Sequence, residues 1–138
     1  MPNRAALNET PKVAPPMHIG EVAARTELSL RSLRHWDEVG LLRPSGRTDG
    51  GFRLYTEADV DKILIIRRMK PLGFTLDQMS AAMRDIESLQ HPGTSDDLAQ
   101  AHERLAALLR EAAGRRQKLV SQLGMADEFI HLLGERLA

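Results

Sequence analysis

The last third of the chain holds the feature that most constrains the fold, an apolar stripe with spacings of three and four residues. It runs over residues 96–123, about four heptads, and His102 and Arg116 interrupt it. A helix this long with one apolar side needs a partner helix. We therefore expect an interface helix over residues 94–124. The residues that mark its stripe are Leu98, Leu105, Leu109, Ala112, Leu119 and Leu123.

Two short helical patterns joined by a tight turn stand near the start of the chain. Ser29 is a good N-cap for a helix over residues 30–39, and Gly40 suits the position that ends it. Two short helices joined in this way form a helix-turn-helix. The residues expected to face the core are Ile19, Val22 and Ala23 in the first helix, and Leu33, Trp36 and Val39 in the second.

A β-hairpin, or wing, is predicted next, because Asp49-Gly50-Gly51 is a hairpin turn signal and alternating residues follow it. Thr56 suits the N-cap of a third helix, which Pro71 and Gly73 stop. Its expected core residues are Val60, Ile63, Leu64 and Ile66.

A capping box over residues 75–78 predicts a fourth helix that ends near Leu89. A linker over residues 91–93 follows, and Ser95 is expected to cap the long helix. Residues 125–138 are expected to form a short terminal helix or tail. The predicted fold is mainly α, with a winged helix-turn-helix domain over residues 17–90 and the long interface helix after it.

Residues 1–16 contain four prolines and no periodic apolar pattern, so we expect a disordered leader. The start lacks an apolar signal-peptide core, and no run approaches the roughly 20 apolar residues of a membrane span. We therefore expect a cytoplasmic protein without a membrane partner. The absence of cysteine excludes disulfides, thiolate metal sites, iron–sulfur clusters and thiol redox sensing.

Positive charge is placed in three clusters, although the net charge is zero. Residues 1–75 hold 12 Lys and Arg against 9 Asp and Glu, whereas residues 76–138 hold 7 against 10. Phosphate contacts along a duplex need cations at several separate points. The candidate DNA-binding residues are Arg31, Ser32, Arg34 and His35 on the polar side of helix 30–39, Arg47 and Arg53 on the two arms of the wing, and Arg67 and Lys70 near the end of the third helix.

Residues 17–89 resemble the N-terminal domain of the MerR family of bacterial regulators. The matching stretches are HIGEVAARTELS, LRSLRHWDEVGLLRP, GRTDGGFRLYTEADVDKI and IIRRMKPLGFTLDQM. The long helix corresponds to the family's antiparallel dimerisation helix. This match rests on position and periodicity, not on a sequence motif.

The resemblance implies a homodimer that presents two winged heads to a palindromic promoter operator. Such regulators repress, or they bend and underwind DNA so that RNA polymerase can engage promoter elements that are spaced too far apart. This distortion costs several kcal/mol, which backbone contacts must offset. A nucleoid-associated protein is therefore expected.

The resemblance also implies residue roles. Arg31 and Arg34 match contacts of the recognition helix, Arg47 and Arg53 match wing arginines that grip phosphate, and Arg67 and Lys70 match contacts near the second wing. His35-Trp36 departs from the usual aromatic pair, and Phe52 replaces a usual wing tyrosine and lacks its hydroxyl. These departures bear on which DNA sequence is recognised.

The sequence indicates no cofactor and no metal, because its five histidines are scattered and none has metal-ligand spacing. The effector is unknown. About 15 residues follow Leu123, too few for a ligand-binding domain. Two interpretations of Phe129, Ile130 and Leu133 remain. They form a small apolar ligand site with a partner chain, or they simply pack in the dimer.

Two other functions stay open at this stage, a DNA-bending recombination factor of the excisionase type and a helical adaptor. The long helix favours a promoter regulator over the first, and the arginines favour it over the second. An enzyme is not expected, because no nucleophile–base set, phosphate-binding glycine loop or convergent carboxylate pair is present.

Overall fold

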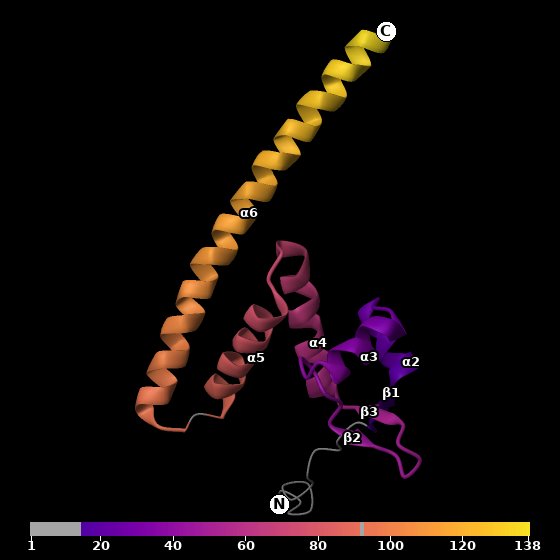
Figure 1. Ribbon diagram of the computed structural model, residues 1–138, viewed down its shortest axis with the longest axis vertical. Helices are drawn as coiled ribbons and strands as arrows, with labels where there is room; N and C mark the ends of the chain where they lie inside the picture. The colour runs from indigo at the N-terminus through magenta and orange to yellow at the C-terminus, as the bar shows by residue number, and fades with distance from the viewer. Residues whose placement is uncertain (1–14, 92) are drawn as a thin grey trace, which may run out of the picture. The chain divides into compact units, whose positions relative to one another are not determined.

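The computed structural model describes residues 15–91 and 93–138. The chain divides into two compact units, one that ends at Ile65 and one that begins at Ile66. Figure 1 shows the elements of both units in chain order. The expected leader, except for Pro15 and Pro16, and Pro92 of the expected linker lie outside the described residues. The division into domains at residues 90–94 stays a prediction.

The first unit contains the predicted helix-turn-helix, formed by α2 (Ile19–Thr26) and α3 (Leu30–Glu38). The Ser29 hydroxyl accepts a hydrogen bond from the Ser32 amide at 3.0 Å, which confirms the predicted N-cap. At the other end Gly40 has φ 75°, and the amides of Gly40 and Leu41 donate to the carbonyls of Asp37 and Trp36. These two bonds form a Schellman motif, which explains why α3 stops where the glycine predicts.

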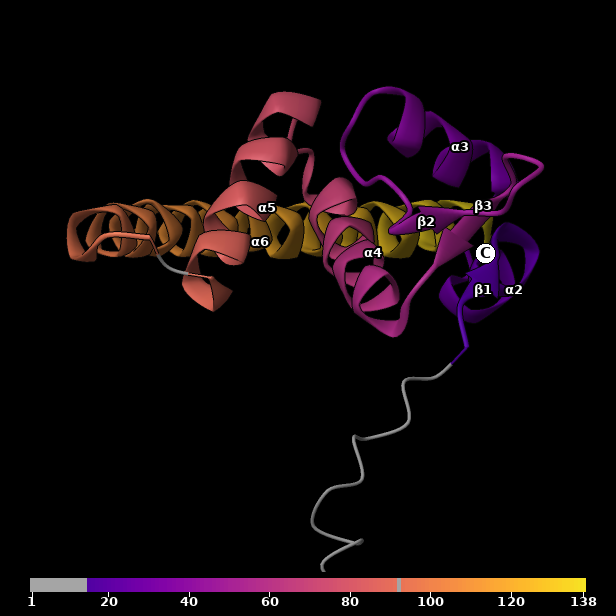
Figure 2. The same cartoon turned by 90° about the horizontal axis from the view of Figure 1, so that it is seen from below.

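The predicted hairpin is present and belongs to a three-stranded antiparallel sheet. Its strands are β1 (Met17–His18), β2 (Gly46–Arg47) and β3 (Arg53–Tyr55), in the order β1-β3-β2. Figure 2 shows the hairpin beside α3. The strand β1 was not predicted, because two residues are too few to show a period of two.

The core of the first unit lies where α2, α3, the sheet and α4 (Glu57–Met69) meet. Leu33 and Trp36 are buried as predicted, whereas Val39 is 39% exposed and its predicted inward position is wrong. Val39 follows the last helical residue, so it no longer continues the apolar face of α3. The most deeply buried side chains in this unit are Val22, Thr26, Leu33, Tyr55 and Ile63.

The start of α4 is held by a buried carboxylate. The Thr56 hydroxyl accepts from the Asp59 amide at 3.1 Å, so the predicted N-cap is present. Asp59, which is 3% exposed, accepts from the Thr56 amide and from both the amide and the hydroxyl of Ser45. The loop before β2 is therefore fixed to α4 by charge-assisted hydrogen bonds.

The second unit contains η1 (Lys70–Leu72), α5 (Leu76–Gln90) and α6 (Ser95–Leu137). The predicted capping box of α5, formed by Thr75 and Gln78, is confirmed. The N-cap of α6 is Thr94, which forms its own capping box with Asp97, so the predicted cap at Ser95 is wrong by one residue.

The prediction of a separate terminal helix is also wrong, because α6 continues without a break through Gly124 to Leu137. One glycine in a helix interior costs about 1 kcal/mol relative to alanine. That cost is small beside the hydrogen bonds of a 43-residue helix, which forms cooperatively.

The first half of α6 packs on α5. Ala101 is fully buried, and Arg104 donates three hydrogen bonds of 2.8–3.1 Å to the carboxylate of Asp85. Further along, Arg115 donates to the Leu72 carbonyl at 2.9 Å and stacks over the Phe74 ring at 4.1 Å. Within residues 15–91 and 93–138, no helix is long and apolar enough to cross a membrane.

Candidate nucleic-acid interface

The helix α3 has one buried apolar side and one exposed cationic side. Leu33 and Trp36 are 1% and 3% exposed and anchor the helix in the first unit. Arg31, Arg34 and His35 are exposed on the opposite side. Across the described ranges, neither of these two arginines forms an ion pair. They can therefore donate to an outside acceptor such as a phosphate or a guanine edge.

Ser32 lies on the same helix but is held by the helix cap. Its amide donates to Ser29 Oγ, and the two hydroxyl oxygens are 3.0 Å apart and hydrogen-bonded. Ser32 is half-buried. Its hydroxyl still has acceptor and donor capacity, so its predicted contact with DNA stays a prediction.

Both wing arginines bind one carboxylate of α3. Arg47 Nη2 and Arg53 Nε each lie 2.7 Å from Oδ2 of Asp37, which is 8% exposed. Burial by itself would raise the pKa of Asp37, but hydrogen bonds and charge from Arg53 and Arg47 lower it overall. Asp37 is thus ionised, and it joins α3 to both strands of the hairpin.

Sequence reasoning missed Asp37 as a functional residue. Its spacing is the available signal, because Asp37 follows the buried Leu33 by four residues and therefore lies on the same side of the helix. The same cluster changes the interpretation of the wing, because Arg53 is only 23% exposed and Arg47 is 47% exposed. Both were predicted to grip phosphate, and both are already held by a carboxylate.

Phe52 lies at the tip of the hairpin and is 70% exposed. Its amide donates to the Thr48 hydroxyl, and its carbonyl accepts from the Thr48 amide. Its ring passes so close to Gly50 that a Cβ there would lie 3.4 Å from it. A large apolar side chain held in solvent at a hairpin tip is free to pack on a partner's backbone.

Two more arginines of the first unit, Arg43 and Arg25, differ in their partners. Arg43 is exposed and its guanidinium lies beside Gly40. Sequence reasoning missed it. Arg25 instead forms a bidentate ion pair with Glu57, at 2.7 and 3.0 Å, which ties α2 to the start of α4. Arg43 is therefore available to an outside anion, whereas Arg25 is structural.

Arg67 and Lys70 belong to the second unit, near the end of α4 and the start of η1, and both are exposed. Their predicted phosphate contacts stay predictions. Within the described ranges, no group of three or more His, Asp or Glu side chains is arranged to hold a metal ion.

The predicted stripe of α6 divides into two sets by exposure. Leu98, Leu105 and Ala112 are half-buried within a single chain, in the part of α6 that packs on α5. Leu109, Leu119 and Leu123 are 71%, 45% and 62% exposed. The exposed apolar residues continue to the end of the helix, and these are Val120, Met125, Phe129, Ile130, Leu132, Leu133 and Leu137.

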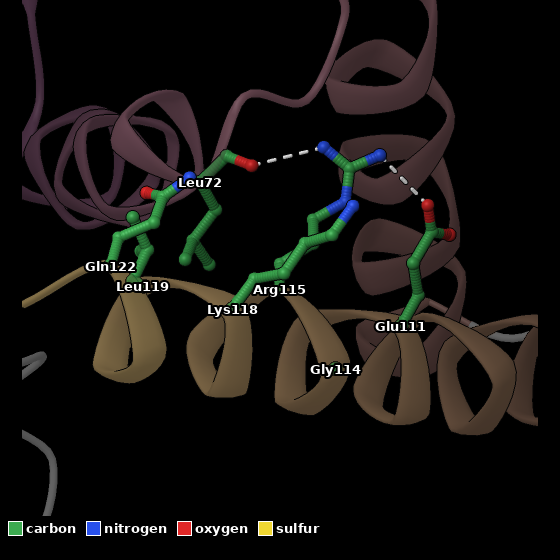
Figure 3. A pocket seen from close by; sticks show the side chains of 7 residues that line it. All are labelled: Leu72, Glu111, Gly114, Arg115, Lys118, Leu119 and Gln122. Atoms are coloured by element: carbon green, nitrogen blue, oxygen red, sulfur yellow. Dashed lines mark hydrogen bonds and ion pairs between the residues drawn. The ribbon is translucent and has the colours of Figure 1, made fainter. Parts of the chain in front are cut away.

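A groove of about 700 Å³ lies beside the start of this exposed region. Figure 3 shows Arg115 at its side, bonded to the Leu72 carbonyl and to Glu111, with Lys118, Leu119 and Gln122 along α6. The groove is open and has both apolar and charged walls.

The chain is similar to known proteins of one family. The model of the MerR HTH family of regulatory proteins matches residues 17–86. The nodulation protein NolA of Bradyrhizobium elkanii is 42% identical over 71 residues, which are 51% of this chain and 32% of NolA. The transcriptional activator TipA of Streptomyces coelicolor is 34% identical over 110 residues, 80% of this chain and 40% of TipA. The chain spans less than half the length of these curated relatives.

A solved structure shares the fold over most of the chain. It is HiNmlR, a MerR family regulator lacking the sensor domain, bound to promoter DNA. The TM-score is 0.64 at 20% sequence identity, and the match covers 89% of this chain and 88% of HiNmlR. At that identity, the likeness concerns the fold alone.

Proposed function

Because the chain belongs to the MerR family of helix-turn-helix regulatory proteins, we propose that it is a sequence-specific, DNA-binding transcriptional regulator of the cytoplasm. The observation that carries the proposal is the exposed cationic side of α3. It lies within the residues that the family model matches, on a helix whose other side is buried.

In this proposal α3 enters the major groove. Arg31 and Arg34 donate to base edges or to phosphates, and His35 contacts a neighbouring base or phosphate. The hairpin follows the backbone, where Arg47, Arg53 and Phe52 contact sugar and phosphate. Arg43, Arg67 and Lys70 add phosphate contacts outside the groove.

We propose further that the regulator is a homodimer, paired through antiparallel α6 helices, on an inverted-repeat promoter operator. Nine of the large apolar side chains between Leu119 and Leu137 are exposed in the single chain, and a partner helix would bury them. Bending and underwinding of the DNA between promoter elements would then let RNA polymerase engage both. No effector or cofactor is part of the proposal, nor is any catalytic reaction.

A DNA-bending recombination factor is the alternative, and the comparisons do not favour it. The family that matches is one of regulatory proteins, and TipA is a transcriptional activator. A 43-residue helix after the winged domain also suits a dimer that spans two half-sites better than a monomeric bending factor.

The test is a selection of genomic DNA fragments by the purified chain at near-physiological salt, followed by sequencing. Enrichment of an inverted repeat between promoter elements with an overlong spacer is the expected result. The variant that lacks both the Arg31 and Arg34 guanidinium groups, made as Arg31→Ala with Arg34→Ala, is the matched control and should recover no motif. Enrichment at recombination sites, or of nothing, would contradict the proposal.

A further inference from the structure

We propose that Asp37 is a positioning residue for DNA recognition: its carboxylate fixes the two wing arginines at a set place relative to the recognition helix. The inference rests on the proposed function. It assigns the specificity of DNA binding partly to Asp37. This residue does not itself contact DNA, because a carboxylate and a phosphate repel each other.

The first argument is geometric. Asp37 lies at the last turn of α3, and its Oδ2 accepts from Arg47 Nη2 and Arg53 Nε, both at 2.7 Å. These arginines come from different strands of the hairpin. One buried carboxylate oxygen therefore connects three elements, and the strands it holds are only two and three residues long. Strands that short have few ladder bonds to fix their own position.

The second argument concerns charge. Arg47 and Arg53 are directly opposite each other across the antiparallel pair. Like charges at directly opposed positions destabilise a sheet. The Asp37 carboxylate compensates for this repulsion, and it leaves the cluster of three side chains with one net positive charge. A DNA phosphate can be attracted to that remaining charge.

The third argument concerns the donors that remain. Arg53 uses Nε for Asp37, so the two amino groups of its guanidinium can still donate to an outside oxygen. Arg47 uses Nη2 for Asp37, and its Nη1 makes a long bond of 3.4 Å to the Gly51 carbonyl. Each guanidinium is thus oriented by the protein and can still bind a phosphate, which is what preorganisation of a contact requires.

The test compares specific and non-specific binding by Asp37→Asn, which keeps the shape of the side chain and removes its charge. The probes are the inverted-repeat duplex recovered by the wild-type chain and a scrambled duplex of the same length. We expect affinity for the inverted repeat to fall by roughly tenfold, as for loss of a close contact. Affinity for the scrambled duplex should stay equal or rise, because the variant is more positive by one charge.

Asp61→Asn is the matched control, since Asp61 is exposed on α4 and its substitution changes the net charge by the same amount. It should leave the ratio of the two affinities at the wild-type value. A variant that has lost its fold would lose both affinities together. In an Asp37→Asn variant whose circular dichroism spectrum shows that it is folded, an unchanged ratio, whether both affinities fall or neither does, would overturn the inference.

A double-mutant cycle with Arg47→Gln, measured at a temperature at which all four proteins are folded, tests the inference through the coupling between the two side chains. If Asp37 acts through the wing arginines, Asp37→Asn should cost less affinity in the Arg47→Gln background than in the wild type. Additive effects would overturn the inference. If the wild-type chain enriches no DNA at all, the proposed function fails, and the role of Asp37 fails with it.

Discussion

At the residue scale, the arginines of the first unit differ in whether they pair with a carboxylate. Arg25 is held by Glu57, and Arg47 and Arg53 are held by Asp37, whereas Arg31 and Arg34 extend from α3 without an ion pair within the described ranges. An arginine that is paired with a carboxylate has fewer free donors, and less uncompensated charge, to offer DNA than an unpaired one. The unpaired arginines of α3 should therefore carry the larger share of base discrimination.

We expect Arg34→Ala to weaken binding to the inverted-repeat operator by about 1–3 kcal/mol, as for the loss of a base or close phosphate contact. Fluorescence anisotropy with labelled duplex at fixed salt measures this directly. Arg25→Ala is a useful comparison, because Arg25 is engaged with Glu57 and should affect stability more than affinity. Wild-type affinity for Arg34→Ala would contradict the assignment of α3.

The depressed pKa of Asp37 predicts a pH effect on stability. Burial opposes ionisation, but the two arginines outweigh it, so the folded-state pKa lies below the unfolded value of about 3.9. The stabilisation is therefore present above that value and is lost as pH falls through the folded pKa. Urea unfolding should show wild type losing more stability between pH 5 and pH 2 than Asp37→Asn loses. Parallel pH profiles would show that the ion pairs contribute nothing to stability.

At the element scale, the ends of the helices are determined by local backbone chemistry. Ser29, Thr56, Thr75 and Thr94 each accept a hydrogen bond from an amide three residues later. Gly40 ends α3 with a positive φ, and Gly73 follows η1 in the same way. These caps satisfy backbone groups that the helices themselves leave unpaired. The direction in which the chain leaves α3 toward the hairpin therefore depends on the backbone conformation of Gly40.

Gly40→Ala should lower the free energy of unfolding by roughly 1 kcal/mol, because an L side chain is strained at φ 75°. Space is not the cause, since a Cβ there would meet only Arg43, at 3.5 Å. Gly20→Ala on α2 is the matched control. It has ordinary helical backbone and open space, so it should raise stability by roughly 0.5–1 kcal/mol. Thermal or urea unfolding measures both, and equal shifts would contradict the argument.

At the scale of the whole molecule, the two halves of α6 differ in how much of their apolar surface the single chain covers. Its first half packs on α5 through Ala101 and Arg104, and Arg115 donates to the Leu72 carbonyl of η1. Its second half has no such cover among the described residues, and its large apolar side chains are exposed. A helix of 43 residues is about 65 Å long. Under the proposed function each chain has one DNA-reading helix, so such a surface favours assembly into a two-headed dimer.

Leu109→Glu and Ile130→Glu should each yield monomers in light scattering and should lose operator binding, because one head makes half of the contacts. Both side chains are exposed in the single chain, at 71% and 67%, so neither charge should unfold it. Gln100→Glu, exposed outside the stripe, adds the same charge and should stay dimeric. A dimeric Leu109→Glu with monomeric Ile130→Glu would place the interface in the second half of α6 only.

Elements whose signals are local in the chain could be predicted from the amino-acid sequence. The caps at Ser29, Thr56 and Thr75 and the stop at Gly40 were predictable, because each is decided by side chains and backbone within about four residues. The helix-turn-helix, the hairpin and the exposed side of α3 followed from the same short-range patterns. The family resemblance over residues 17–89 agrees with the match over residues 17–86.

Contacts between residues far apart in the chain could be identified only in the folded structure. Asp37 meets Arg47 and Arg53, which are 10 and 16 residues away, and no periodicity ranks one such pairing above another. The strand β1 depends on β3, which is more than 30 residues later. Similarly, the apolar residues of the α6 stripe are alike in type, but Leu105, beside α5, is half-buried whereas Leu109 and Leu123 are exposed. Burial and pairing are properties of the folded surface, so the pattern alone cannot assign them.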